Sequence, residues 1–280
     1  RKSRVFMTRS AVGTVVAKAV TMRLHSLLLP SFVLLSLSTA ACSLKLGDKT
    51  QGEKGTMTFA YDGPHCFFGC GLDRSALQGS LVTVSASGTD ADVRPTARIS
   101  SDARIASVSN QRESCSCGSS SSSHSSSHSV DAGAKCSSGE TKTCTLSIDI
   151  ETTAEGDAEL EVVDAKGALI DRVAIHVRPA ARIDVEVNNA AVKDGEISTV
   201  RIGDKVGLKS HAFDADGTEE IFTKHGISHD YGDNTIVKPD DSVLFGSTDV
   251  EDMVAVEAGD TTVTVRAPGA SRVVRFHVVN

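Results

Sequence analysis

The sequence predicts an all-β protein that consists of two β-sandwiches in tandem, and three observations lead to this prediction. First, segments 145–150, 183–187 and 274–278 alternate apolar and polar residues, which is the pattern of antiparallel strands with one buried face. Second, turn residues recur between such segments, as at 164–167 and 268–269, and no long stretch has a helical stripe of apolar residues. The third observation is an internal repeat.

The repeat consists of matching segments that occur in the same order in both halves of the chain. The matched pairs are 79–84 with 203–208, 101–108 with 248–256, and 156–177 with 259–278. Both copies close with a two-strand hairpin that ends on an apolar residue, His and Val. A repeated plan of this length predicts two domains of similar architecture, which we place at 55–179 and 180–280.

Residues 1–41 are expected to be an N-terminal extension followed by a secretory signal. Arg23 supplies a positive start, 27–37 is an apolar run, and small residues precede Cys42. This run is about half of the roughly 20 residues that a spanning helix needs. A short tether, 42–54, is expected to follow the signal.

The ending Thr39-Ala40-Ala41-Cys42 resembles the lipobox of bacterial lipoproteins, although Thr39 stands where that family usually has Leu. The resemblance implies that Cys42 becomes the first residue of the mature protein and carries a diacylglycerol thioether and palmitate. Ser43 in the next position implies, by the same resemblance, the outer membrane of a Gram-negative bacterium. The expected location is therefore the cell envelope, with the C-terminal domain farther from the membrane.

The charge of the chain argues against nucleic acid as a partner. The whole sequence has 29 basic and 36 acidic residues, and six of the basic ones lie in 1–41. Removal of that segment leaves a net charge of about −13, whereas nucleic-acid binding depends on a basic surface.

Six cysteines remain when Cys42 is set aside, and an even number in an exported chain favours disulfides. They are Cys66, Cys70, Cys115, Cys117, Cys136 and Cys144. We expect Cys115 and Cys117 to reach different partners, and at least one of Cys66 and Cys70 to be linked to the insertion described next. A zinc site with His124 and His128 is the alternative, but the spacings do not match paired C-x2-C ligands.

Residues 110–144 interrupt the first domain as a Cys- and Ser-rich insertion. Its central run, 118–129, contains only Gly, Ser and His, and such a run buries too little apolar surface to order itself. We therefore expect a loop with cysteines at its base.

These repeats resemble the group 2 bacterial immunoglobulin-like domains, the intimin and invasin type. The resemblance rests on the Gly-polar opening strand at 203–208, the Ser-Asp and apolar strand at 101–108, and the closing Gly-Asp-x-x-Val-Thr-Val at 259–265. It implies an immunoglobulin-like Greek-key sandwich that acts as a spacer or adhesive module without catalysis or cofactor.

The strongest candidate for chemistry is 225–233, where His225, His229, Asp230 and Asp233 crowd a segment that its glycines predict to be a loop. Asp214, Asp216 and Gly217 begin like a calcium loop but lack the later ligands, so a hairpin turn is preferred. His176 and His277 occupy equivalent places in the two copies, and we expect both to face solvent. No catalytic or metal site is assigned.

The sequence thus predicts a non-enzymatic, lipid-anchored envelope protein that acts as a binding, adhesion or spacer module. Its expected partners are the membrane, through the anchor, and an envelope protein or polysaccharide. The alternative is an exported metal-binding or hydrolase-accessory protein that uses 225–233.

Overall fold

The computed structural model describes residues 49–63, 66, 69–88, 95–118, 127–130, 135–138, 140–240 and 250–280. All the secondary-structure elements in these ranges are β-strands. Within these ranges, no helix has the length and apolar character needed to cross a membrane. The expected signal at 1–41, the lipidated Cys42 and the Ser-rich run 119–126 lie outside the described residues.

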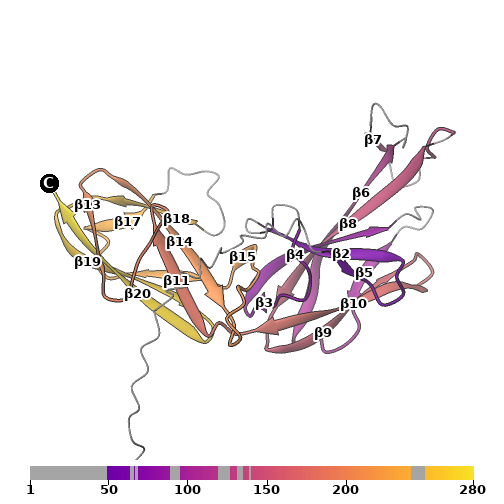
Figure 1. Ribbon diagram of the computed structural model, residues 1–280, viewed down its shortest axis with the longest axis horizontal. Helices are drawn as coiled ribbons and strands as arrows, with labels where there is room; N and C mark the ends of the chain where they lie inside the picture. The colour runs from indigo at the N-terminus through magenta and orange to yellow at the C-terminus, as the bar shows by residue number, and fades with distance from the viewer. Residues whose placement is uncertain are drawn as a thin grey trace, which may run out of the picture. The chain divides into compact units, whose positions relative to one another are not determined.

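The first half of the chain forms a sandwich of two sheets (Figure 1). The first sheet has the order β1 (Thr50–Gln51), β2 (Met57–Asp62), β4 (Ser80–Gly88), β8 (Thr141–Thr152), β6 (Ala106–Gly118) and β7 (Ser127–Val130). The second sheet has the order β3 (Ala76–Leu77), β10 (Leu169–Arg178), β9 (Gly156–Val163) and β5 (Thr96–Ile99). All pairs are antiparallel except β3 with β10.

The second half repeats this arrangement with ten further strands, of which one joins the first half. One sheet has the order β12 (Ala190–Ala191), β11 (Arg182–Val187), β14 (Lys205–Phe213), β18 (Val250–Ala255) and β17 (Val237–Pro239). The other has the order β13 (Ile197–Arg201), β20 (Ala270–Val279), β19 (Gly259–Ala267) and β16 (Ser228–Tyr231), with β13 parallel to β20. The remaining strand, β15 (Lys224–His225), pairs with β4.

The two sandwiches have the same strand order. In the letters of the immunoglobulin fold, β2, β4, β8 and β6 form an ABED sheet, and β10, β9 and β5 form the opposing GFC sheet. Strands β11, β14, β18 and β17 repeat the first sheet, and β20, β19 and β16 repeat the second. The prediction of an all-β protein with two immunoglobulin-like sandwiches is therefore confirmed.

Details of the closing hairpins also recur. The Nδ1 atom of His176 lies 2.9 Å from Asp157 on the neighbouring strand, and His277 lies 2.6 Å from Asp260 in the same way. Because these pairs occupy matching positions, residues five places earlier, Asp171 and Arg272, are also equivalent.

One pair of repeat segments was matched to the wrong strand. In both sandwiches a turn on an aspartate, Asp102 or Asp233, is followed by an isoleucine, Ile105 or Ile236, whose amide hydrogen-bonds to the carbonyl of that aspartate. The structural counterpart of 101–108 is therefore 232–239, which ends with β17, and not 248–256. The alternation of apolar residues is similar in neighbouring strands, so the sequence did not distinguish β17 from β18.

Each sandwich has its own apolar core, formed by the inward residues of its alternating strands. The largest fully buried side chains of the first include Tyr61, Phe59 and Ile148, and those of the second include Phe276, Leu208 and Met253. A small third cluster joins Leu77 to Ala180, Ala212 and Phe222.

The expected tether, 42–54, was assigned too far along the chain. Thr50 and Gln51 pair with β2 as β1, and the amide of Lys54 donates to Asp171 over 2.8 Å. Residues 50–54 therefore belong to the first sandwich.

The insertion, 110–144, is also not a separate loop throughout its length. Residues up to Gly118 continue β6, and residues from Thr141 begin β8, so that both strands extend as one paired ribbon. The register pairs Cys115 with Cys144 directly, which explains why this end of the ribbon is held together.

Candidate functional site

All six described cysteines form disulfides, and each pair lies within the first sandwich. The pairs are Cys66–Cys70, Cys115–Cys144 and Cys117–Cys136. Cys115 and Cys117 therefore have different partners. The expected link between the Cys66 region and the insertion is wrong, because a tight turn brings Cys66 and Cys70 together: the amide of Cys66 donates to Gly63, and the amide of Gly69 donates to Cys66.

The same pairing speaks against a zinc site at the insertion. The two groups of three ligand-type side chains that lie close together among the described residues are Glu113 with Cys115 and Cys144, and Glu140 with Cys117 and Cys136. Each group contains both sulfurs of a disulfide, and a bonded sulfur is not the thiolate that binds zinc. His124 lies outside the described residues, and the side chain of His128 is not described.

The structure separates the residues of 225–233 instead of gathering them, and the segment contains strands β15 and β16 rather than a single loop. His225 is exposed in β15, which pairs with β4. His229 is partly buried, 3.7 Å from Glu251, and its burial lowers its pKa. Asp230 forms an ion pair with Arg266. Among the described residues, neither group of side chains that could hold a metal includes a residue of 225–233, so the structure gives no support to the metal-binding alternative at this segment.

The preferred reading of 214–217 as a hairpin turn is confirmed. The carboxylate of Asp214 accepts hydrogen bonds from the amides of Asp216 and Thr218, at 3.0 and 2.9 Å, and Gly217 has a φ of 80°. Because this oxygen is engaged by the turn itself, the segment is a structural corner.

The sequence did not reveal the segment that follows this turn, residues 219–226, which we call the strap. The strap bonds first to the second sandwich, through the amide of Glu220 and the carbonyl of Ala212. It then bonds to the first sandwich, where the amide of Ile221 donates to Ser75 and the amide of Thr223 donates to Leu81. The apolar pair Ile221-Phe222 after a turn was the one available signal, since both side chains are buried.

Gly226 closes the strap against the first sandwich. It has a φ of 78°, and a Cβ there would lie 2.8 Å from the side chain of Ser80 and 2.9 Å from that of Leu77. Both the backbone conformation and the close approach require glycine. Both sandwiches accordingly belong to one compact unit.

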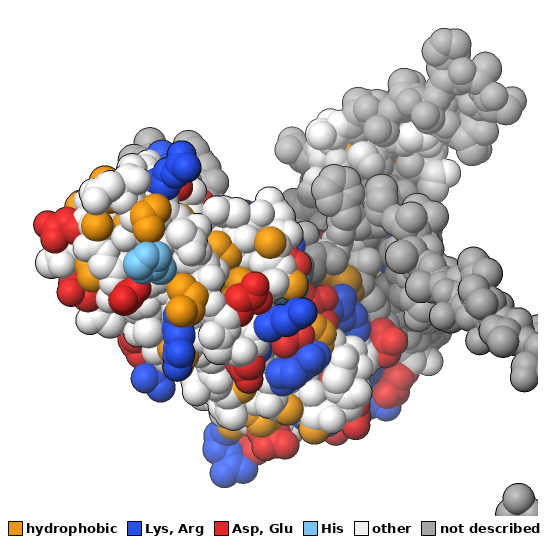
Figure 2. Space-filling model, turned by 60° about the vertical axis from the view of Figure 1, so that its left-hand side comes forward, with side chains coloured by type: hydrophobic (Ala, Val, Ile, Leu, Met, Phe, Trp, Pro, Cys, Tyr) orange, Lys and Arg blue, Asp and Glu red, His pale blue; other side chains and the backbone are white. Residues whose placement is uncertain are grey.

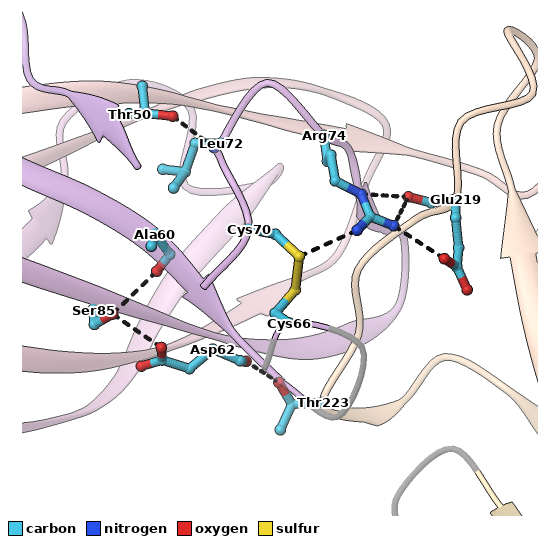
Figure 3. The surroundings of a disulfide bond; sticks show 10 residues. All are labelled: Thr50, Ala60, Asp62, Cys66, Cys70, Leu72, Arg74, Ser85, Glu219 and Thr223. Carbon is cyan, nitrogen blue, oxygen red and sulfur yellow. Dashed lines mark hydrogen bonds and ion pairs between the residues drawn. A yellow bond between two sulfur atoms is a disulfide. The ribbon is translucent and has the colours of Figure 1, made fainter. Parts of the chain in front are cut away.

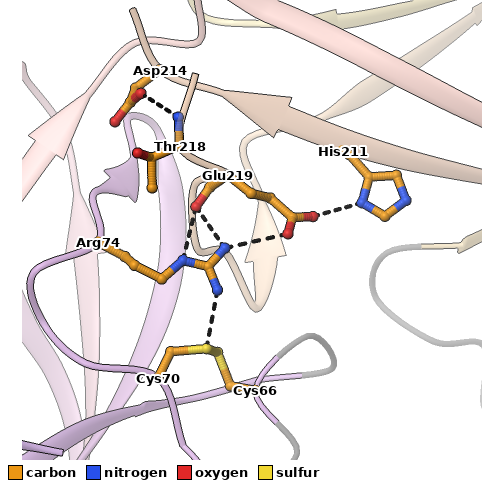
Figure 4. Close-up of polar contacts among 7 residues, drawn as sticks. All are labelled: Cys66, Cys70, Arg74, His211, Asp214, Thr218 and Glu219. Carbon is orange, nitrogen blue, oxygen red and sulfur yellow. Dashed lines mark hydrogen bonds and ion pairs between the residues drawn. A yellow bond between two sulfur atoms is a disulfide. The ribbon is translucent and has the colours of Figure 1, made fainter. Parts of the chain in front are cut away.

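A polar network crosses the same region (Figure 3, Figure 4). The guanidinium of Arg74 donates to the carbonyl of Glu219 at 3.0 and 2.6 Å, and lies 3.3 Å from its carboxylate. The other carboxylate oxygen of Glu219 lies 2.6 Å from Nδ1 of His211, and this hydrogen bond raises the pKa of His211. Arg74 also donates to the sulfur of Cys70 over 3.2 Å, so the Cys66–Cys70 disulfide supports the network.

Glu220 lies next to this network and is fully buried. Among the described residues neither of its carboxyl oxygens has a hydrogen-bond partner. Burial and the nearby charge of Asp214 raise the pKa of Glu220 to about 8, because water no longer stabilises its ionised form.

The outer surfaces of the two sandwiches differ. Among the described residues the exposed large hydrophobic side chains are Ile197, Ile202, Val256 and Val273, and all four belong to the second sandwich. Figure 2, which turns that side forward, shows hydrophobic side chains between Lys, Arg, Asp and Glu side chains. Single apolar side chains on a surface are common, so these four residues mark a difference between the two sandwiches and do not by themselves define a site.

Comparison with known proteins gives likenesses of structure only. No family model matches the sequence, and no curated protein matches it. Among solved structures the chain is similar to domains 4 and 5 of the S-layer protein SbsC, with 18% identity over 47% of this chain and 69% of that one and a TM-score of 0.26. It is also similar to InvD of Yersinia pseudotuberculosis, with 17% identity over 73% of this chain and 55% of that one and a TM-score of 0.24.

A third likeness is to FdeC, an adhesin of Escherichia coli, with 13% identity over 84% of this chain and 65% of that one and a TM-score of 0.28. The assignment of the fold rests on the strand order described above.

Proposed function

We propose that the protein is a non-enzymatic binding module of the bacterial cell envelope, in which the first sandwich is the supporting domain and the second presents the binding surface. The observation that carries this proposal is the unequal distribution of surface features. The disulfides lie in the first sandwich, and the exposed large hydrophobic side chains lie in the second. A supporting domain gains from cross-links, whereas a binding domain needs exposed contact groups.

Attachment through a lipid on Cys42, at the outer membrane of a Gram-negative bacterium, is part of the proposal. Two acyl chains would give stable anchoring where one is marginal. Because 50–54 belong to the fold, only 43–49 separate Cys42 from the first strand. Seven residues span at most about 25 Å, which supports an arrangement with the first sandwich near the bilayer and the second farther away.

The anchor and the binding role are tested separately. Cys42→Ala should move the protein from the membrane fraction to the soluble fraction, and a soluble wild-type protein would refute the anchor. For binding, the wild-type protein should retain envelope material that elutes as one defined component, and Val273→Asp should weaken retention more than the similarly exposed change Ser109→Asp in the first sandwich. Equal retention by both variants would refute the assignment of the binding surface.

A further inference from the structure

A groove of about 580 Å³ lies on the second sandwich, between the start of β11 and the strand β20. Three arginines from these two strands line it, Arg182, Arg272 and Arg275, together with Asp194 from the connection between β12 and β13. The chain as a whole has a net charge of −7, so a concave surface with three guanidinium groups differs from the rest of the molecule.

Two of the arginines are held in fixed positions. Arg272 is only 16% exposed, donates to the carbonyl of Val192 over 2.6 Å, and lies 3.5 Å from Asp194. Arg182 lies 3.0 Å from Asp184, and its guanidinium carbon lies 4.2 Å from the centre of the Phe213 ring. An arginine held in this way loses little conformational entropy when it binds a ligand.

Arg275 supplies a positive charge that is available to a ligand. Its side chain is exposed, and no hydrogen bond or ion pair joins it to any other described residue. The counter-charge in the groove, Asp194, is 93% exposed, so water screens it strongly. The groove therefore has an excess of positive charge that the protein itself does not neutralise.

The shape and composition of the groove restrict its ligand to an extended anion. Guanidinium groups bind carboxylates and phosphates through paired hydrogen bonds. The lining of the groove is mainly charged, polar or small, with Ile183 and Val273 as the larger aliphatic side chains, so the groove offers few of the apolar contacts that protein partners commonly need. It also has no aromatic side chain in its lining on which a neutral sugar could stack. Ile197, which pairs with Arg275 in the sheet, and Val273 offer apolar flanks.

We propose that this groove binds an acidic polysaccharide through the oxyanions on its sugars, with Arg275 as the main contact and Arg182 and Arg272 as positioned supports. The inference rests on the proposed function, since it names the ligand class of that binding module. Carboxylates and phosphates share this chemistry, and the experiment below separates them.

The test is a titration of the whole protein, purified in detergent, with three polysaccharides: polygalacturonate, dextran phosphate and neutral dextran. We expect saturable binding of at least one acidic polymer, no binding of dextran, and an affinity at least tenfold lower in Arg275→Ala. The matched control is Arg98→Ala in β5 of the first sandwich, where Arg98 is 57% exposed and pairs with Glu161. That variant should bind as the wild type does.

Equal affinities of the wild type and Arg275→Ala would overturn the inference, and so would an equal loss in Arg98→Ala, which would mean binding to general surface charge. Failure of both acidic polymers to bind would overturn it too, while the retention of envelope material by the wild type would still support the proposed function. Arg275→Lys keeps the charge without the fork of donors, so partial binding by this variant supports recognition of the oxyanion by the guanidinium.

Discussion

The two sandwiches share a strand order, but an equivalent position early in their last strands carries opposite charges. In the first, Asp171 on β10 is fully buried and accepts hydrogen bonds from the amides of Lys54, Thr56 and Met57, at 2.8 to 2.9 Å. In the second, the equivalent residue is Arg272, which binds one carbonyl and faces the groove. The shared positions set the fold, and the positions that differ separate support from recognition.

The first prediction concerns this pair. Asp171→Ala would remove the buried carboxylate and leave the buried amide of Met57 and the partly buried amides of Lys54 and Thr56 without their acceptor. We expect a loss of about 2–4 kcal/mol in the free energy of unfolding. The matched change Arg272→Ala should cost about 1 kcal/mol, because it removes one hydrogen bond and a contact to an exposed carboxylate. Urea unfolding of the whole protein measures both values. Equal losses from the two substitutions would mean that Asp171 and Arg272 contribute equally to the stability of their sandwiches.

Asp171 should also make the stability of the protein depend on pH. Burial alone would raise the pKa of Asp171, but the hydrogen bonds from Lys54, Met57, Arg172 and Thr56 outweigh it, so the pKa lies below its usual value. The stability that the ionised carboxylate contributes is therefore present above about pH 4 and is lost as the pH falls through the lowered pKa.

The disulfides of the first sandwich should differ in their effect. Cys115–Cys144 spans 29 residues and Cys66–Cys70 spans 4, and on the chain-entropy estimate their removal costs about 3–4 and about 2 kcal/mol. Calorimetry of the two double alanine variants should show a larger decrease in melting temperature for the Cys115 and Cys144 pair. The reverse order would show that the short disulfide acts mainly through Arg74 and the strap.

The contribution of the strap to stability can be tested by substituting two glycines that have nearly the same backbone conformation. Gly226 and Gly167 have φ values of 78° and 81°, but a Cβ meets Ser80 and Leu77 at Gly226 and nothing within 4 Å at Gly167. Gly167→Ala should cost about 1 kcal/mol for the backbone alone. Gly226→Ala should cost about 2 kcal/mol or more, because Ser80 or Leu77 must also move. Equal costs would show that the close approach at Gly226 is not important for stability.

The last prediction concerns the pH dependence caused by Glu220. With a pKa of about 8 in the folded protein and an ordinary value when unfolded, the folded state holds a proton that the unfolded state releases between about pH 4.5 and pH 8. Stability should therefore fall as the pH rises through this window and level off above it. His211, whose pKa Glu219 raises, acts in the same direction above about pH 6.5.

Glu220→Gln should remove most of this slope, so that the variant exceeds the wild type by about 1–3 kcal/mol at pH 8 and by less at pH 5. The control is Glu257→Gln at an exposed position. Melting temperatures measured across pH 5 to 9 give the comparison. A difference that does not depend on pH would show that the buried carboxyl does not titrate in this range.

Local patterns predicted most of the fold. The strands β8, β11 and β20 follow from strict alternation, and the matched hairpins follow from the repeat that ends on His176 and His277. These features depend on neighbouring residues, so the sequence contains them. The hairpin turn at Asp214 was predictable for the same reason.

Features that depend on distant contacts were not predictable. The cysteine pairs depend on the register of β6 with β8 and on the turn after Gly63, neither of which the spacing determines. The position of the strap depends on such contacts: Ile221 packs in the core of the first sandwich, and Phe222 packs with Leu77, Ala180 and Ala212. The groove is formed by β11 and β20, which lie about 90 residues apart in the sequence.

Hydrogen exchange of the whole protein, followed by mass spectrometry with and without reductant and with and without polygalacturonate, tests the division between the two sandwiches most directly. We predict that reduction speeds exchange in 63–75, in the strap and at the paired ends of β6 and β8, and leaves the strands of the second sandwich unchanged. We predict that the polymer slows exchange near the groove, in 181–195 and 269–275, and leaves the first sandwich unchanged. Protection of the first sandwich by the polymer, or an equal response of both sandwiches to reductant, would contradict this account.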